Sequence, residues 1–286
     1  MVSSQVRREQ VKLAVNQGMS IRKACKFVGI SRTGFFYKPK YTERDEILSE
    51  KLKRLSREHV RWGYRFASAV LLREDSDATP KRVYRLWRKL CLQVPYRHKR
   101  RKIRTGASAQ PVAEKVNSVW AWDFIFDRCA TGRQIKCFNV VDEKTRECLA
   151  IDVSNSIRSG RVIEVLSGLV ARYGAPQYIR SDNGSEFIAN AIKKWLKEAR
   201  IETAYIDPDK PWQNPFIESF NSRFRDECLN AEVFLNRFEA RIVIEDWRRH
   251  YNEFRPHSSL GYQTGSVQSF SHFPFSGVLN LTILFQ

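Results

Sequence analysis

Three acidic residues in the second half of the chain stand where carboxylates could do chemistry. Asp123 lies in the middle of the aromatic run WAWDFIFD, where a carboxylate is costly unless it is paired or binds a metal. Asp182 lies in SDNGSEF, directly after a predicted strand, and open α/β sheets bind ligands beyond the C-terminal ends of their strands. Glu218 opens a predicted helix in NPFIESFNSRF. We take these three residues as the candidate catalytic residues.

Carboxylates from distant parts of a chain make chemical sense together as ligands of hard divalent cations. Mg²⁺ prefers oxygen ligands and is usually held by a few carboxylates and by substrate phosphates. Two such ions, about 3.5–4 Å apart, can stabilise both the attacking and the leaving oxygen of a phosphoryl displacement. The pattern therefore predicts a site for two Mg²⁺ ions, for which Mn²⁺ could substitute. A basic protein with such a site would cut or join DNA.

Two of these carboxylates also have an ordinary structural explanation, and the third has a neighbour that could replace it. Asp182, Asn183 and Gly184 are residue types that form turns. Glu218 could simply favour a helix N-terminus, where the helix dipole stabilises a negative charge. Asp127 is four residues after Asp123 and shares its face of the strand, so it could take the same role. Residue types and spacing leave these alternatives open.

The elements that must position these carboxylates form an α/β pattern. Apolar runs at 119–126, 135–141 and 148–153 are short, β-branched and aromatic, and they predict a three-stranded meander. The elements expected after the meander are a helix at 159–173, a strand at 177–180, a helix at 185–200, a strand at 202–206 and a helix at 216–229. Such an order predicts a mixed sheet with helices on its faces.

The charge of the chain is concentrated in its first part. The 286 residues carry a net charge of +19. Residues 1–117 hold 29 Lys and Arg against 10 Asp and Glu, whereas the remaining residues hold 21 of each kind. A polyanion is the expected partner of such a basic region. Nucleic acid is favoured over an anionic membrane because no basic amphipathic helix has the bulky apolar face that membrane anchoring requires.

Residues 8–38 predict short helices in a helix-turn-helix pattern. Ser20 can cap a helix that breaks at Gly29, and Ser31 can cap the next one. Because the start of the second helix enters the major groove in such motifs, we expect Arg32, Thr33 and Lys38 to face DNA. A plain helical hairpin is the alternative.

Residues 43–93 predict a second helical module, with helices near 47–55 and 66–72 and a third that opens at Thr79 and Pro80. The third helix has a buried stripe of Val83, Leu86, Trp87 and Leu90, and cations fill its other faces. The expected phosphate contacts are Lys81, Arg82, Arg85, Arg88 and Lys89 of this helix and Lys99, Arg100, Arg101, Lys102 and Arg104 of the basic run after it. A solvated basic surface is the alternative.

The chain is expected to contain five segments. They are a helix-turn-helix-like module at 1–40, a second helical DNA-binding module at 41–95, a basic linker at 96–117, a catalytic core at 118–265 and an uncharged tail at 266–286. The six cysteines are scattered, without a C-x-x-C pair or a Cys/His cluster, and indicate reduced packing residues rather than a disulfide or zinc framework. The apolar end of the tail is too short and too polar to span a bilayer, and we expect no membrane partner.

Long motifs in the chain resemble a known family. SDNGSEF, WQNPFIESFNSRFRDECLN and WRRHYNEFRPHSSLGYQT are similar to the second-frame transposases of bacterial insertion-sequence family three, which are related to retroviral integrases. HVRWGYRFASAVL and KRVYRLWRKLCL resemble the N-terminal helical region of that family, and the segment from WAWDFIFD to ECLAIDV resembles its first strands.

The resemblance implies a ribonuclease-H-like catalytic core with a triad of two aspartates and a glutamate, which maps onto Asp123, Asp182 and Glu218. The family also carries a basic residue seven positions after the glutamate. Arg225 matches that position, and helical geometry brings it to the face of Glu218, from which it could reach the DNA backbone. Arg223 is a second candidate DNA contact, for which a plain surface arginine is the alternative.

The implied activity is metal-dependent DNA strand cleavage and strand transfer, the work of a polynucleotidyl transferase. The implied partners are the terminal repeats of the element, target DNA, further copies of the chain on DNA, and an upstream reading frame that is fused to this one. The implied location is the bacterial cytoplasm, at the nucleoid. The competing hypothesis is a DNA-binding relic or repressor-like copy without catalysis.

The chain departs from the family pattern in three places. Asp207 and Asp209 lie in a loop that is usually basic or neutral, and their charges would repel DNA locally. Gly265 stands where proline commonly follows the YxT motif. The uncharged tail that follows has no counterpart in the motifs above.

Overall fold

The computed structural model describes residues 3–37, 43–75, 77–94, 111–181, 190–205 and 214–266. The chain divides into two compact units, Met1–Lys51 and Leu52–Gln286, and each is described by itself. The predicted segment boundaries stay predictions. No helix among the described residues is both long and apolar enough to cross a membrane.

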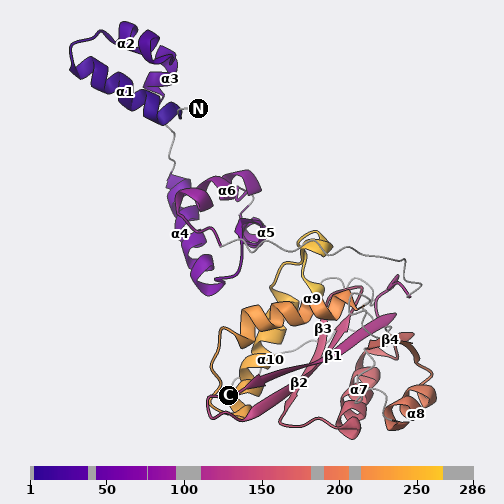
Figure 1. Cartoon of the computed structure of the whole chain (residues 1–286). Coiled ribbons are helices and arrows are strands. Elements are labelled where there is room, and N and C mark those ends of the chain that lie inside the picture. The colour runs from indigo at the N-terminus through magenta and orange to yellow at the C-terminus, as the bar shows by residue number, and fades with distance from the viewer. Residues whose placement is uncertain are drawn as a thin grey trace, which may run out of the picture. The chain divides into compact units, whose positions relative to one another are not determined.

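The first unit contains a small three-helix cluster, drawn in indigo in Figure 1. Its helices are α1 (Ser4–Asn16), α2 (Ile21–Val28) and α3 (Arg32–Phe36). The side chains of Ser20 and Ser31 accept hydrogen bonds from backbone N–H groups of α2 and α3, so both predicted caps are present. Gly29 ends α2 with φ of +70°, a conformation that glycine adopts without strain. The predicted helix, turn and helix are therefore confirmed.

The second helical module consists of α4 (Glu43–Glu58), which crosses the boundary between the units, α5 (Tyr64–Glu74) and α6 (Pro80–Lys89). Pro80 occupies the start of α6 as predicted, and Thr79 is its N-cap residue. Val83, Leu86 and Trp87 are buried, which confirms most of the predicted stripe; Leu90 is half-buried.

Five strands form one mixed sheet in the order β3-β2-β1-β4-β5 (Figure 1). Their bounds are β1 (Val119–Arg128), β2 (Gln134–Asp142), β3 (Cys148–Ser154), β4 (Tyr178–Ser181) and β5 (Glu202–Tyr205). The first three strands are antiparallel, whereas β4 pairs parallel with both β1 and β5. The predicted meander and mixed sheet are confirmed.

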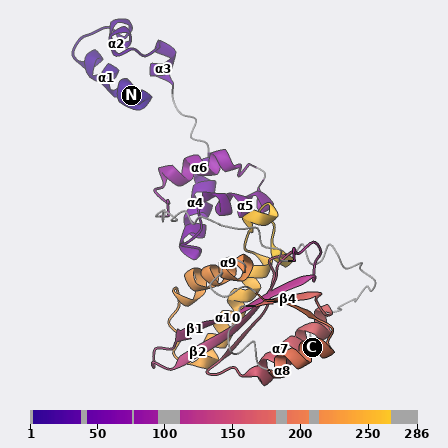
Figure 2. The same cartoon turned by 45° about the vertical axis from the view of Figure 1, so that its right-hand side comes forward.

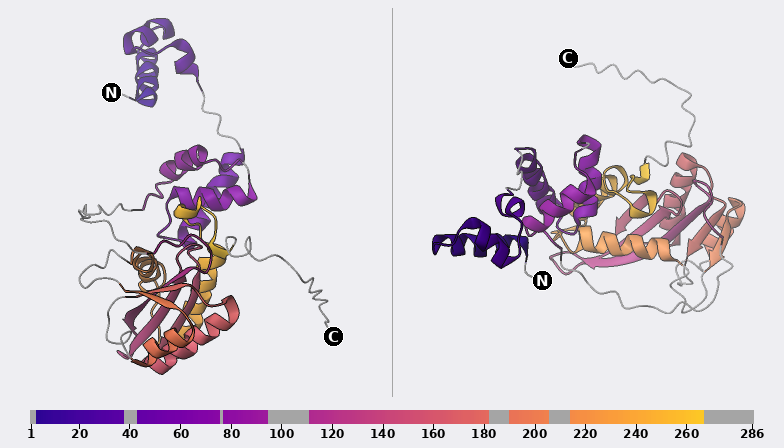
Figure 3. Two further views of the ribbon diagram at one scale, coloured as in Figure 1. Left: turned by 90° about the vertical axis from the view of Figure 1, so that its right-hand side faces the viewer. Right: turned by 90° about the horizontal axis from the view of Figure 1, so that it is seen from above.

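Helices cover both faces of this sheet (Figures 2 and 3). They are α7 (Ser159–Tyr173), α8 (Asn190–Glu198), α9 (Pro215–Phe224), its continuation η2 (Arg225–Leu229) and α10 (Arg237–Glu253), and the short 3-10 helix η3 (Ser258–Leu260) follows. Trp120 and Phe138 pack with α7 and α8 in one core. Ala121 and Cys137 pack with α9 and α10 in the other. This arrangement is the ribonuclease-H-like α/β fold that the resemblance implied.

Two elements differ from the sequence expectation. The predicted helix at 216–229 is α-helical only to Phe224, and η2 then continues it as a π-helix. The predictions did not include α10. Its buried positions, which include Ala240, Ile244 and Tyr251, are separated by many charged residues, so its apolar stripe is weak in the sequence and depends on the sheet that it covers.

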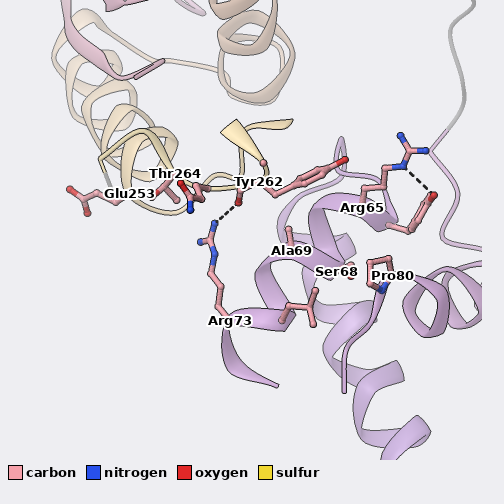
Figure 4. A pocket seen from close by; sticks show the side chains of 12 residues that line it. Arg65, Ser68, Ala69, Arg73, Pro80, Glu253, Tyr262 and Thr264 are labelled. Atoms are coloured by element: carbon pink, nitrogen blue, oxygen red, sulfur yellow. Dashed lines mark hydrogen bonds between the residues drawn. The ribbon is translucent and has the colours of Figure 1, made fainter. Parts of the chain in front are cut away.

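The second helical module packs against the end of the core within the second unit. The guanidinium of Arg73, on α5, donates hydrogen bonds to the carbonyl oxygens of Phe254 at 3.1 Å and of Tyr262 at 3.2 Å. The rings of Trp62 and Phe254 stack, with centroids 6.0 Å apart. A pocket of about 630 Å³ lies between α5 and the segment from Gly261 to Thr264 (Figure 4). Asp123 and Glu218, the two predicted catalytic carboxylates among the described residues, do not line this pocket.

Gly265 has a structural reason to be glycine. A Cβ atom added there would lie 3.2 Å from the carbonyl oxygen of Thr145 and 3.3 Å from the backbone nitrogen of Glu147. Both contacts are to backbone, so any larger residue, proline included, requires the turn between β2 and β3 to shift. Asp207, Asp209 and residues 267–286 lie outside the described residues.

The six cysteines are free thiols. Five of them are buried, which confirms the predicted packing role, whereas Cys91 is exposed and that prediction is wrong for it. Burial raises the pKa of Cys137 and of Cys228 to about 12, which keeps both as neutral packing groups.

Acid should destabilise the folded chain through His257. This residue is 6% exposed, and its Nε2–H donates to the carbonyl oxygen of Tyr251 at 3.3 Å. Burial, and then the nearby positive charge of Arg255, lowers its pKa to about 4. Between pH 6.5 and about pH 4, this imidazole is therefore protonated in the unfolded chain and neutral in the folded chain. The free energy of unfolding falls as the pH falls through this range. We expect a loss of about 3 kcal/mol between pH 7.5 and pH 4 from this group.

Urea unfolding of the wild type and of His257→Asn, at a series of pH values, measures this term. The variant should lose less stability on acidification than the wild type does. Identical pH dependence in the two proteins would show that His257 does not contribute it.

Candidate active site

Asp123 lies at the middle of β1 on the face that α9 and α10 cover. Ala121 and Ile125, two residues before and after it, belong to the core beneath those helices. The carboxylate of Asp123 is half-buried; its Oδ1 accepts from the backbone N–H of Phe124 at 2.7 Å, and its Oδ2 accepts from the side-chain amide of Asn221 at 2.7 Å. The strand thus presents a carboxylate between apolar neighbours, as the sequence predicted, and the amide of Asn221 pairs with it.

Glu218 lies in the first turn of α9, where the helix dipole favours an acidic group. Its side chain is exposed, while Ile217 and Phe220 beside it are buried. The guanidinium of Arg146 lies over the ring of Phe216, 3.9 Å from its centroid, and so attaches the start of α9 to the turn between β2 and β3. The hydrogen bond from Asn221 to Asp123 joins α9 to β1 one turn after Glu218.

Asp182 lies outside the described residues. The parallel ladder between β1 and β4 pairs Ala121 with Arg180, and β4 ends at Ser181. The paired positions Ala121 and Arg180 therefore precede Asp123 and Asp182 by two residues each.

A buried ion pair secures the end of β4. Arg180 donates from Nε to Oε1 of Glu143 at 2.6 Å and from Nη2 to the carbonyl oxygen of Pro111 at 2.6 Å. The side chains of Arg180 and Glu143 are 4% and 0% exposed. This contact ties β4 to the end of β2 and to the segment that enters the core.

Breaking this ion pair should strongly destabilise the core. In Arg180→Met the carboxylate of Glu143 would remain buried without its cation, which typically costs about 3–5 kcal/mol. The matched control is Lys194→Met, which removes an exposed pair at 3.9 Å with Glu198 and should cost less than about 1 kcal/mol. Chemical unfolding of both variants measures the difference. Equal losses of stability would contradict the assigned role of Arg180.

Arg225 lies at the start of η2 and contacts β1. Its Nη2 donates to the carbonyl oxygen of Phe126 at 2.6 Å, and its Nη1 lies 3.6 Å from Oδ1 of Asp127. Arg223 is exposed. The DNA contacts predicted for both arginines stay predictions.

The candidate DNA contacts of the helical modules lie mostly on surfaces. Arg32 and Thr33 are exposed at the start of α3. On α6, Lys81, Arg85, Arg88 and Lys89 are exposed, whereas Arg82 is half-buried and lies 3.6 Å from Asp77. The remaining candidates lie outside the described residues: Lys38, Lys99, Arg100, Arg101, Lys102 and Arg104.

The donor atoms fit a hard divalent cation, because every predicted ligand is a carboxylate. Within the described ranges, no three residues of the types His, Cys, Asp and Glu gather as a metal site, and one of the three predicted ligands is not among those residues.

Sequence reasoning missed Asn221 and Asn139 beside Asp123. Asn139 interrupts the apolar run IKCFNVVD, which is the same signal that singled out Asp123.

Comparisons with known proteins agree with this architecture. Two models of the integrase core domain match residues 113–211 and 199–264, and a model of an HTH-like domain matches residues 43–100. The 39.2 kDa protein of insertion element IS476 from Xanthomonas euvesicatoria is 39% identical over 262 residues, which cover 91% of this chain and 75% of that one. The 31.7 kDa protein of insertion element IS407 from Burkholderia multivorans is 39% identical over 254 residues, 89% of this chain and 92% of that one. The chain belongs to the transposases of insertion-sequence family three.

A less similar transposase and a solved integrase core also match this chain. The transposase for insertion sequence element IS629 from Shigella sonnei is 27% identical over 233 residues, 77% of this chain and 78% of that one. Among solved structures, the magnesium complex of the HTLV-2 integrase catalytic core domain is 14% identical with a TM-score of 0.42; the match covers 54% of this chain and 97% of that one.

Proposed function

We propose that the chain catalyses metal-dependent strand cleavage and strand transfer at the ends of an insertion sequence. The observation that carries the proposal is the hydrogen bond from Asn221 to Asp123, because it holds the helix that bears Glu218 against the strand that bears Asp123. The ladder of β1 and β4 supports the inclusion of Asp182, since it ends two residues before that position and two before Asp123.

In this proposal Asp123, Asp182 and Glu218 hold two Mg²⁺ ions. When bound, such ions stabilise the negative charge on the attacking and the leaving oxygen. The first reaction is attack of water on a phosphodiester at the end of the element, which frees a 3′-hydroxyl. That hydroxyl then attacks a second phosphodiester directly, so no covalent bond to the protein forms. Asn221 holds one oxygen of Asp123 throughout.

The helical modules would supply DNA affinity in this proposal. The exposed Arg32 at the start of α3 and the basic face of α6 would bind the terminal repeats, because neutralised phosphates release condensed counterions. Arg223 and Arg225 would contact the DNA backbone near the carboxylates. The two ends of one element must be held together, which implies at least a dimer on DNA.

Cleavage of a labelled duplex that carries the terminal repeat tests the proposal. We expect the full chain to nick this duplex with Mg²⁺ or Mn²⁺, to stop when the metal is chelated, and to lose the activity in Asp182→Asn. Equal activity in wild type and variant would remove Asp182 from the site. Intact binding without cleavage in the wild type would support the competing hypothesis of a repressor-like copy.

A further inference from the structure

We propose that Asn139 is a positioning residue that acts through Asn221 on the carboxylate of Asp123. The inference rests on the proposed function, because it treats Asp123 as a metal ligand. It assigns Asn139 a task at the metal site although its side chain would touch neither metal nor DNA.

The three side chains form one continuous chain of hydrogen bonds. Asn139 on β2 stands directly opposite Asp123 on β1 in the antiparallel ladder. Nδ2 of Asn139 donates to Oδ1 of Asn221 at 2.7 Å, and Nδ2 of Asn221 donates to Oδ2 of Asp123 at 2.7 Å. The helix α9 thus inserts one amide between two neighbouring strands.

The chemistry of these groups allows only one direction of hydrogen-bond donation, from Asn139 to Asn221 and from Asn221 to Asp123. An ionised carboxylate can only accept hydrogen bonds, so Asn221 must turn its NH₂ group towards Asp123. The carbonyl oxygen of Asn221 then points away from Asp123 and needs a donor. Asn139 supplies that donor, and it thereby holds Asn221 in the orientation that favours the carboxylate over the opposite, repulsive orientation.

Packing alone does not explain an asparagine at this position. Asn139 is 0% exposed and shares its face of β2 with the buried side chains of Cys137 and Val141. Its own Oδ1 is buried without a hydrogen-bond partner. An apolar residue of similar size would avoid the cost of this unpaired oxygen. The polar residue is therefore explained by the single bond that it donates to Asn221.

Substitutions of Asn139 by residues of similar size separate its effect on the orientation of the Asn221 amide from its effect on packing. Asn139→Leu removes the donor, whereas Asn139→Asp replaces it with an acceptor and drives Asn221 to turn its carbonyl oxygen towards Asp123. Partners that orient metal ligands typically contribute about 10- to 100-fold to metal affinity or activity. We expect the Mn²⁺ affinity of the full chain, measured by calorimetry, to fall about 10-fold in Asn139→Leu and about 100-fold in Asn139→Asp. Cys137→Val, on the same face of the same strand, is the matched control and should bind Mn²⁺ like the wild type.

A double-mutant cycle with Asn221→Leu tests whether Asn139 acts through Asn221. Once Asn221 is replaced, Asn139→Leu should change Mn²⁺ affinity by less than about 2-fold, because the hydrogen-bond connection from Asn139 through Asn221 to Asp123 is already lost. Asn221 is only half-buried, so this background should remain folded even if Asn139→Asp does not. A purely structural Asn139 would instead give the same loss in both backgrounds, and that result would overturn the inference.

The outcomes distinguish this inference from the proposed function. A wild type that neither binds Mn²⁺ nor cleaves the terminal-repeat duplex would defeat the proposed function. It would also remove the premise that Asp123 is a metal ligand. A wild type that does both, beside Asn139 variants with unchanged Mn²⁺ affinity, would defeat the inference about Asn139 alone.

Discussion

Asp123→Asn should lower metal-dependent cleavage of the terminal-repeat duplex by about 10³-fold or more, because it removes one charged oxygen from a site whose residues act as a unit. The amide keeps the size of the side chain and can still accept from the N–H of Phe124. Its NH₂ group would face the NH₂ group of Asn221, and two donors cannot form a hydrogen bond with each other. The variant therefore also weakens the hydrogen bond that joins β1 to α9. Gel assays of single-turnover cleavage at saturating Mg²⁺ measure the loss.

The matched control is Asp127→Asn. Asp127 shares the strand and the face of Asp123, but it lies beside Arg225, with the contacting atoms 3.6 Å apart. We expect its activity to stay within about 3-fold of the wild type, the effect of weakening a partly exposed ion pair. If Asp127→Asn were the inactive variant and Asp123→Asn the active one, the assignment of the metal ligand on β1 would be wrong.

Neutralising the exposed face of α6 should weaken DNA binding by about two orders of magnitude at 0.1 M salt. In the triple variant Lys81→Gln, Arg85→Gln and Arg88→Gln, up to three phosphate contacts are lost, and each contact contributes about 0.9 to the slope of log affinity against log salt. The slope should therefore become shallower by about 3. The three positions are exposed, while Val83, Leu86 and Trp87 hold the helix in place from its other side, so the fold should persist.

The control removes the same charge from another helix. Lys193, Lys194 and Lys197 are exposed on α8 in the core, and we do not predict that they contact DNA. Their replacement by Gln should leave the slope nearly unchanged, since only charges next to phosphates release counterions. A slope that changes equally in both triple variants would show that α6 contributes only net charge. Salt titrations by fluorescence anisotropy measure both slopes.

These substitutions on α6 are a sharper test than removal of the whole basic region. The described part of residues 52–94 is joined to the core by Arg73 and by the ring of Trp62. A truncation through this region would expose the core surface that those residues cover, and lost affinity would then have two explanations.

Local patterns predicted much of this fold because the signals lie within single elements. The aromatic and β-branched runs around Asp123 predicted β1, and Pro80 predicted the start of α6. Helix α10 was missed because its apolar stripe is interrupted by charges, and its pairing with the sheet is a long-range contact. The π-helical turn after Phe224 was missed for a similar reason, since no local residue pattern distinguished it from a continued α-helix.

The sequence by itself determined the α/β order, the basic first part and the family with its candidate carboxylates, because residue type and spacing carry that information. Only the tertiary structure decided that Asn139 and Asn221 connect β2, α9 and β1, and that Arg180 finds its carboxylate in Glu143. Asn139 and Asn221 are 82 positions apart along the chain, and each of these side chains has many conceivable partners in the sequence. Burial selects among them, because a polar group removed from water must find a partner that the fold has already brought within hydrogen-bond distance.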